Sequence, residues 1–153
     1  MSRRPVAIAL GSNLGDRQSH LDSAVAKLRQ RLDDVRVSRW IETTAVAAGP
    51  QPDYLNGALV GITSLSPRAL LDELLDLERD RGRERPYRNA PRPLDLDLIL
   101  YGGEVIDEPG LTVPHPRFRE RLFVLEPLSQ IAGDWIDPVT GQTITQLLAQ
   151  RLS

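Results

Sequence analysis

A strand that carries two carboxylates constrains this chain more than any other segment; it runs Arg-Pro-Leu-Asp-Leu-Asp-Leu-Ile-Leu-Tyr over residues 92–101. Side chains alternate between the two faces of a strand, so the leucines share one face and the aspartates share the other. The leucine face, which predicts burial in a core, consists of Leu94, Leu96, Leu98 and Leu100. Residues two apart on one face lie about 6.5 to 7 Å apart, so Asp95 and Asp97 are expected to project side by side from a rigid support.

Two carboxylates at this spacing are typical of a site for hard cations that are bridged by substrate oxygens. A Mg²⁺ site takes one or two carboxylates from the protein and completes its shell with phosphate oxygens and water. Asp95 and Asp97 are therefore sufficient as the protein ligands of a two-cation site. The alternative interpretation is an edge strand with one wet face, which is typical of an isolated Asp-x-Asp.

A run of arginines precedes the strand and favours the cation site. Between residues 79 and 92 it comprises Arg79, Arg81, Arg83, Arg85, Arg88 and Arg92. Gly82, Pro86 and Pro91 interrupt the run, and a helix would not continue through them. We therefore expect much of this segment to be a loop rich in positive charge.

The rest of the chain predicts a mixture of strands and helices. Apolar runs predict strands at Val6 to Leu10, at 35–43 and at 58–62, and the Gly102-Gly103 turn predicts a hairpin into Val105-Ile106. Helical spacing predicts one helix capped by Asp16, one from Ser66-Pro67 to Gly82, and a closing helix from Ile144 to Leu152.

Two local features leave alternatives open. The glycine turn at residues 11–16 stands where a phosphate-binding turn could precede a helix, but it lacks the Lys-Ser/Thr of a P-loop, and we interpret it as structural. Glu78 lies on the apolar stripe of its helix, so a partly buried carboxylate there needs a partner, for which a nearby arginine is the simplest candidate.

Composition limits the classes of function. The chain has 153 residues, 41% of them hydrophobic, and no cysteine, so we expect one domain over residues 1–153 without disulfides or thiolate metal sites. A net charge of -2 gives no general electrostatic case for binding nucleic acid. No apolar run reaches the length of a membrane span, and we expect a cytoplasmic protein without nucleic-acid or membrane partners.

Four motifs together resemble the 6-hydroxymethyl-7,8-dihydropterin pyrophosphokinase family of folate biosynthesis. They are Ala-Leu-Gly-Ser-Asn-Leu-Gly-Asp at 9–16, Gln-Pro-Asp-Tyr-Leu-Asn at 51–56, Arg-Pro-Leu-Asp-Leu-Asp-Leu at 92–98 and Val-Pro-His-Pro-Arg at 113–117. The resemblance covers nearly the whole chain. It implies an α/β (α+β) fold of ferredoxin-like type with a largely antiparallel sheet, two Mg²⁺ ions, and a monomer that transfers pyrophosphate from ATP to the pterin hydroxymethyl group.

The resemblance also assigns roles residue by residue. Asp95 and Asp97 would hold the cations and, with Arg83 and Arg92, form the catalytic set. The residues implied in ATP binding are Arg83, Arg85, Arg92, Leu98, Thr112, His115 and Arg121. The residues implied in pterin binding are Thr43, Thr44, Val46, Tyr54, Asn56 and Phe123, with the rings of Tyr54 and Phe123 on either side of the pterin. The arginine loop, 83–91, would close over the reacting groups.

Two positions depart from the family pattern. Asn89 stands where many relatives have tryptophan, which leaves open whether Tyr87 seals the site in its place. Gly110 stands where an arginine often precedes Leu-Thr-Val-Pro-His, so the phosphate contact of that arginine is either missing or supplied by Arg117 or Arg119. Two other hypotheses remain at this point: a different Mg²⁺-dependent nucleotidyl or glycosyl transferase, and a non-catalytic ligand-binding domain of the same shape.

Overall fold

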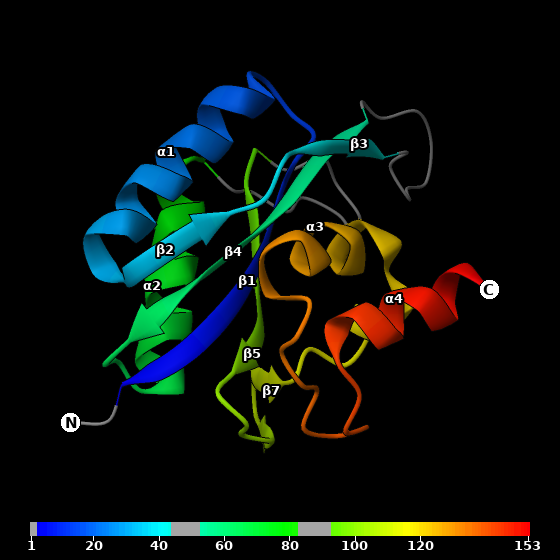
Figure 1. Cartoon of the computed structure of the whole chain (residues 1–153). Coiled ribbons are helices and arrows are strands. Elements are labelled where there is room, and N and C mark those ends of the chain that lie inside the picture. Colours follow the sequence, from blue (N-terminus) through cyan, green and yellow to red (C-terminus); the bar gives the residue numbers. More distant parts are fainter. Residues whose placement is uncertain (1–2, 44–52, 83–92) are drawn as a thin grey trace.

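The computed structural model describes residues 3–43, 53–82 and 93–153, and in them a central sheet separates two groups of helices (Figure 1). The sheet has the order β2-β4-β1-β5, with β3 also paired to β4, and every pairing is antiparallel. Its strands are β1 (Arg4–Ser12), β2 (Asp33–Val37), β3 (Ile41–Thr43), β4 (Tyr54–Thr63) and β5 (Asp95–Tyr101). The expected antiparallel α+β architecture is confirmed.

Two helices cover one face of this sheet and two cover the other. The first pair is α1 (Arg17–Arg31) and α2 (Pro67–Asp80), and the second is α3 (Leu122–Ala132) and α4 (Ile144–Leu152). A small separate sheet joins β6 (Ile106–Glu108) to β7 (Leu111–Val113), and a 3-10 turn, η1, spans Phe118–Glu120. No helix in the described part of the chain has the length and apolar character needed to cross a membrane.

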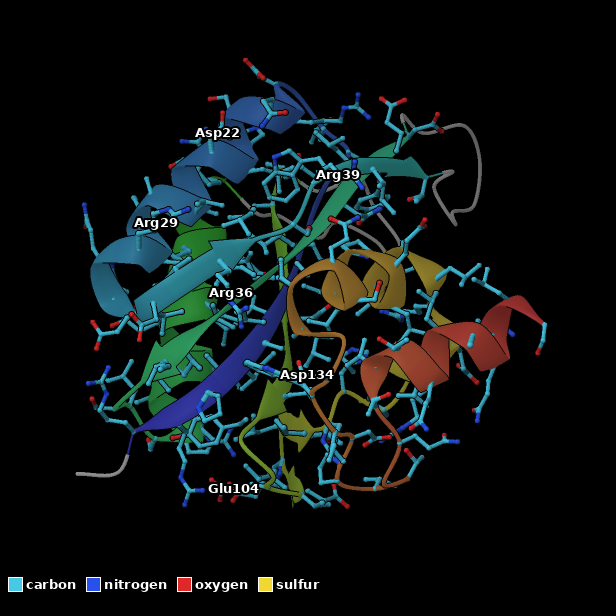
Figure 2. All side chains as sticks on the ribbon, viewed as in Figure 1. Asp22, Arg29, Arg36, Arg39, Glu104 and Asp134 are labelled. Carbon is cyan, nitrogen blue, oxygen red and sulfur yellow. The ribbon has the colours of Figure 1, made fainter. Side chains whose placement is uncertain are left out.

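The predicted helix ends are confirmed by their caps. The Asp16 side chain accepts a hydrogen bond from the Ser19 N–H at the start of α1, and the Ser66 side chain accepts one from the Ala69 N–H at the start of α2. Gly82 follows the end of α2 with a φ of +79°, the left-handed conformation that ends many helices. Figure 2 shows Asp22 and Arg29 on the surface of α1 that faces solvent, as an amphipathic helix requires.

A β-bulge corrects the predicted faces of β5. In the register with β1, Leu98 lies opposite Ile8 and Leu100 lies opposite Ala7, so Ile99 is the extra residue. A bulge shifts the alternation by one residue. Leu94, Leu96 and Leu98 therefore pack beneath α1 and α2 as predicted, whereas Leu100 packs on the opposite face with Ile99.

Two other strand predictions need correction. The single strand expected at 35–43 is divided into β2 and β3, because the Ser38 hydroxyl accepts the Ala58 N–H of β4 between them and the Trp40 ring lies against Gly57. The Gly102-Gly103 turn exists, but it does not make a hairpin of β5 with the next strand, since β6 pairs with β7 in the separate sheet.

The sequence predicted no helix where α3 lies. Pro127 stands inside this helix, where it lacks the N–H that would bond the preceding turn. Burial of Val124, Leu125 and Leu128 against the second face of the sheet holds the helix in place. The closing helix α4 agrees with its prediction and begins with a capping box of Thr143 and Gln146.

Candidate functional site

The candidate site begins with a row of residues that crosses the sheet. Gly11 of β1 lies opposite Asn56 of β4 on one side and opposite Asp95 of β5 on the other. The next row places Ala9 between Ala58 and Asp97. Directly opposed side chains share a face, so Asn56 and the two aspartates lie on the same face. Neighbouring strands are about 4.8 Å apart, so roughly 10 Å separates Asn56 from Asp95 across Gly11.

The pterin-binding candidates that the structure describes lie on this face too. Thr43 lies opposite Tyr54 in the pairing of β3 with β4, and Tyr54 is two residues from Asn56. Asn56 is buried, and its Nδ2 donates to Thr43 Oγ1 at 2.6 Å. These three side chains therefore form one polar and aromatic cluster at the end of the sheet.

Gly11 allows the side chains of Asn56 and Tyr54 to lie close to β1, between this cluster and the aspartates. A Cβ atom at residue 11 would lie 2.7 Å from Asn56 Oδ1 and 3.4 Å from Tyr54 Cδ1. Any larger residue would displace the asparagine or the ring. The small buried residues Gly11 and Ala9 of β1 thus separate a group suited to a heterocycle from a pair of carboxylates.

The aspartates fit a cation that is completed by phosphate and water. Asp95 and Asp97 are half-buried neighbours on one face of β5, so both carboxylates are accessible to cations bound to the same substrate. Among residues 3–43, 53–82 and 93–153, no group of three or more His, Cys, Asp or Glu side chains is arranged for a metal. Two aspartates are too few to complete the coordination shell of a metal by protein ligands alone, but they suit Mg²⁺ that is also bound by substrate oxygens.

The segment after β7 brings His115 toward β5. The Val113–Pro114 peptide bond is cis, and the His115 N–H donates to the carbonyl oxygen of the bulged Ile99 at 3.1 Å. The bulge therefore supplies the contact that fixes His115 beside the aspartate strand. Sequence alternation alone gives no signal of this contact.

The surroundings of His115 favour the neutral form of its imidazole. Burial lowers the pKa of His115, the guanidinium groups of Arg121 and Arg117 lower it further, and the carboxylate of Asp95 acts in the opposite direction. Nδ1 accepts a hydrogen bond from the Arg117 N–H at 3.3 Å, so the proton of the neutral ring lies on Nε2. His115 thus offers one N–H donor, which suits a phosphate oxygen.

Arg121 and Phe123 lie together at the start of α3. The Arg121 guanidinium carbon lies 5.6 Å from the centroid of the Phe123 ring, within the range of a cation–π contact. Phe123 also packs against the core that includes Ala9 and Ala58, the small residues beside the candidate site. The ATP candidate Arg121 and the pterin candidate Phe123 are therefore neighbours.

The remaining described candidates are placed less directly. The Leu98 side chain is buried beneath α1 and α2, on the face opposite the aspartates, so only its backbone is placed to reach a nucleotide. Thr112 is exposed on β7, which contacts β5. Gly110 has a φ of +76° in the turn between β6 and β7, a conformation that favours glycine.

Gly110 has no side chain to bind phosphate, and the two arginines considered as substitutes for it are paired differently. Arg119 donates to the fully buried carboxylate of Asp137 through Nε at 2.5 Å and Nη2 at 2.9 Å. Those bonds commit it to the fold. Arg117 has an exposed pairing with Glu120 at 3.2 Å, which a phosphate can replace at little cost.

Several candidates lie outside the described residues. They are Arg83, Arg85, Arg92, Thr44 and Val46, together with Tyr87 and Asn89 of the arginine loop. Their roles stay predictions from the resemblance.

Arg17 is a contributor that the sequence did not reveal. Its Nη2 donates to Glu42 Oε1 at 2.5 Å on β3, and its Nη1 donates to the Asp53 carbonyl oxygen at 2.9 Å, just before β4. One guanidinium thus joins the residue before Thr43 to the residue before Tyr54. A partner of this kind, distant in sequence, leaves no local pattern.

We expect Arg17→Ala to weaken pterin binding selectively. The two strand ends that carry Thr43 and Tyr54 lose their link, and a half-exposed pairing of this kind is equivalent to about 1 kcal/mol, or about a fivefold rise in the pterin Kd. Calorimetric titration of the variant with pterin and with ATP checks this. Arg3→Ala, which removes an exposed arginine paired with Asp33, is the matched control. An unchanged pterin Kd would show that the link does not support the site.

Comparison with known proteins finds one family model, 7,8-dihydro-6-hydroxymethylpterin-pyrophosphokinase (HPPK), which matches residues 7–133. A 2-amino-4-hydroxy-6-hydroxymethyldihydropteridine pyrophosphokinase of Synechocystis is 44% identical over 145 residues, which cover 94% of this chain and 74% of that protein. The protein of the same name from Haemophilus influenzae is 41% identical, and the match covers 94% of this chain and 90% of that one.

Longer proteins contain the same unit. A mitochondrial folate synthesis bifunctional protein of Arabidopsis thaliana is 42% identical over 86% of this chain, which spans 24% of that protein. The crystal structure of Plasmodium falciparum HPPK-DHPS has a TM-score of 0.74 at 11% identity, and the match covers 97% of this chain and 45% of that one. At that identity the likeness concerns the fold, and it agrees with the ferredoxin-like expectation.

Proposed function

The chain belongs to the 7,8-dihydro-6-hydroxymethylpterin-pyrophosphokinase family, and we propose that the sheet face bearing Asn56, Asp95 and Asp97 is where its reaction takes place. The reaction is pyrophosphoryl transfer from ATP to 6-hydroxymethyl-7,8-dihydropterin, a step of folate synthesis. The observation that carries the site assignment is the row in which Gly11 separates Asn56 from Asp95.

The row orders the two substrates. The pterin lies over Gly11 between the rings of Tyr54 and Phe123, and its polar edge meets Asn56 and Thr43, with Thr44 and Val46 completing that edge. The triphosphate lies toward β5, where His115 donates from Nε2 to a phosphate oxygen and Arg121 pairs with another. Arg83, Arg85 and Arg92 add charge from the arginine segment, Thr112 and the Leu98 backbone contact the nucleotide, and Arg117 binds the phosphate oxygen that Gly110 cannot reach.

Asp95 and Asp97 are the proposed ligands of two Mg²⁺ ions. When bound, these ions neutralise and align the triphosphate oxygens. The residues of the chain then need only to position the pterin hydroxyl in line with the β-phosphorus and to exclude water, because phosphoryl-type transfer depends chiefly on positioning and charge. The bond from the pterin oxygen to the β-phosphorus forms as the hydroxyl proton is released to water. The bond between the β-phosphorus and the oxygen that bridges it to the α-phosphorus breaks, and AMP leaves with that oxygen.

The assay that tests the function follows AMP. Purified protein with ATP and Mg²⁺ should form AMP only when 6-hydroxymethyl-7,8-dihydropterin is present, in a one-to-one ratio with pterin diphosphate. AMP formation that does not depend on pterin would instead favour another Mg²⁺-dependent transferase. Binding of both substrates without turnover would favour a non-catalytic domain.

We further infer that residues 1–153 form one pyrophosphokinase domain that acts as a cytoplasmic monomer. The absence of cysteine supports a reducing compartment. The described candidates for pterin, cation and phosphate binding come together on β4, β5 and the start of α3 within one chain, which supports a site formed without a second copy. Sedimentation of the protein at assay concentration tests the monomer directly.

A further inference from the structure

Glu78 is a buried carboxylate that contacts the backbone between the two aspartates. It lies near the end of α2 and is 1% exposed. Its Oε2 accepts a hydrogen bond from the Leu96 N–H at 2.7 Å. Leu96 is the residue between Asp95 and Asp97, so this bond is made to the peptide group that joins Asp95 to the rest of the strand.

The direction of that N–H shows what the bond does. β5 is the last strand in the order β2-β4-β1-β5, and in the described part of the chain no strand pairs with its outer side. In an antiparallel strand, successive residues turn their N–H groups alternately to the two sides. Because the Leu96 N–H points to Glu78 on α2, those of Asp95 and Asp97 point to β1. The aspartate backbone is thus held from both sides.

Burial of the Glu78 carboxylate at this position carries a cost in folding stability. A buried carboxylate loses its hydration, and the last turn of a helix, where Glu78 lies, disfavours negative charge. The stripe of Leu70, Leu74 and Leu77 would accept another apolar residue at this position. The Glu78 carboxylate does, however, give the outward-facing Leu96 N–H an acceptor, which an apolar side chain at this position would not.

We propose that Glu78 is a positioning residue for the cation site. Its carboxylate fixes the peptide between Asp95 and Asp97, and so fixes the spacing and direction of the two side chains that meet the substrate-bound cations. The proposal rests on the function proposed above for Asp95 and Asp97. It assigns to α2 a role in cation affinity, without contact to the cation.

Two variants separate the hydrogen bond from simple packing. Glu78→Leu removes the hydrogen-bond acceptor and puts an apolar side chain of similar size in its place. Glu78→Gln keeps an acceptor oxygen and removes the charge. In Glu78→Leu we expect the Mn²⁺ affinity of the complex with a non-hydrolysable ATP analogue to fall about tenfold, the size typical when a group that orients a metal ligand is removed. In Glu78→Gln it should fall less than about threefold. Electron paramagnetic resonance of Mn²⁺ measures both without turnover.

Amide hydrogen exchange of the ligand-free protein reports on the bond itself. The Leu96 amide should exchange faster in Glu78→Leu and stay protected in Glu78→Gln, since only the first variant leaves it without an acceptor. The pterin KM should change in neither, because the pterin-binding cluster lies two strands away. Leu77→Ala is the control: it removes a buried side chain from the same turn of α2 and should lower stability without changing Mn²⁺ affinity.

Three outcomes would overturn the proposal. One is unchanged Mn²⁺ affinity in Glu78→Leu. Another applies even if Glu78→Leu does not fold: in Glu78→Gln the Leu96 amide stays protected, yet Mn²⁺ affinity falls about tenfold or more. The charge of Glu78, and not its hydrogen bond to Leu96, would then determine cation affinity. The third is an equal loss in Leu77→Ala. Asp97→Ala, measured in parallel, distinguishes the cases: if it too binds Mn²⁺ normally, the proposed cation site itself is wrong.

Discussion

Replacement of Asp97 by alanine should reduce turnover by about a thousandfold or more while the fold remains. The side chain is half-buried on a strand whose packing comes from the leucines of the other face. Its loss therefore removes little apolar contact, and the melting temperature should stay within about 2 °C of the parent. The reaction, in contrast, loses one of the two proposed ligands of the cations that hold the triphosphate. AMP release and calorimetry measure the two effects.

Asp97→Asn and Asp33→Ala make the test specific. The asparagine keeps the shape and one oxygen but not the charge, so it should fail nearly as badly as alanine if charge holds the cations. Asp33 lies on β2 at the opposite edge of the same sheet, where it pairs with Arg3, and its removal should leave turnover unchanged. Near-normal turnover in Asp97→Ala would take this residue out of the cation site.

Local signals in the sequence predicted the elements that depend on neighbouring residues. The caps at Asp16 and Ser66 are formed within three residues of chain, and alternation placed Asp95 and Asp97 together on one face of β5. Each of these features follows from the geometry of one strand or one helix end. None needs information about a partner strand.

Features that depend on pairing were not predicted. The bulge at Ile99 moved Leu100 to the other face, and the carbonyl oxygen of Ile99 accepts the His115 N–H from a distant part of the chain. The division of the strand at 35–43 depends on the Ser38 hydroxyl meeting the Ala58 N–H from β4. The alternation of apolar and polar residues along a strand predicts neither the bulge nor the division of the strand.

The candidate site likewise combines features that local sequence predicted with features that depend on distant contacts. The aspartates were expected together from their spacing, but their alignment with Asn56 across Gly11 depends on the registers of two separate strand pairs. The long-range contacts of Arg17 with β3 and β4, and of Glu78 with Leu96, depend on how the helices pack on the sheet. α3 was missed because Pro127 opposes a helix locally, and only tertiary burial outweighs that preference.

Replacement of Phe123 by alanine should weaken pterin binding about thirtyfold, or about 2 kcal/mol, and leave ATP binding within about twofold. In the proposed site the ring covers one side of the flat pterin, so its loss exposes that side to water. The same proposal puts the triphosphate toward β5, so ATP is not expected to stack on the ring. Titration of the variant with each substrate alone gives the two dissociation constants.

The chain contains its own control for this prediction. Phe118 is its other phenylalanine, and it also has an arginine over the ring, since the Arg119 guanidinium carbon lies 4.8 Å from the ring centroid. Phe118 is fully buried in the core, however, so Phe118→Leu should lower stability by about 1 kcal/mol with little change in either dissociation constant. Because Arg121 contacts the Phe123 ring, Phe123→Ala also frees a residue proposed for the triphosphate. If the affinity for ATP falls as much as the affinity for pterin, the role of Phe123 is its contact with Arg121 and not stacking on the pterin.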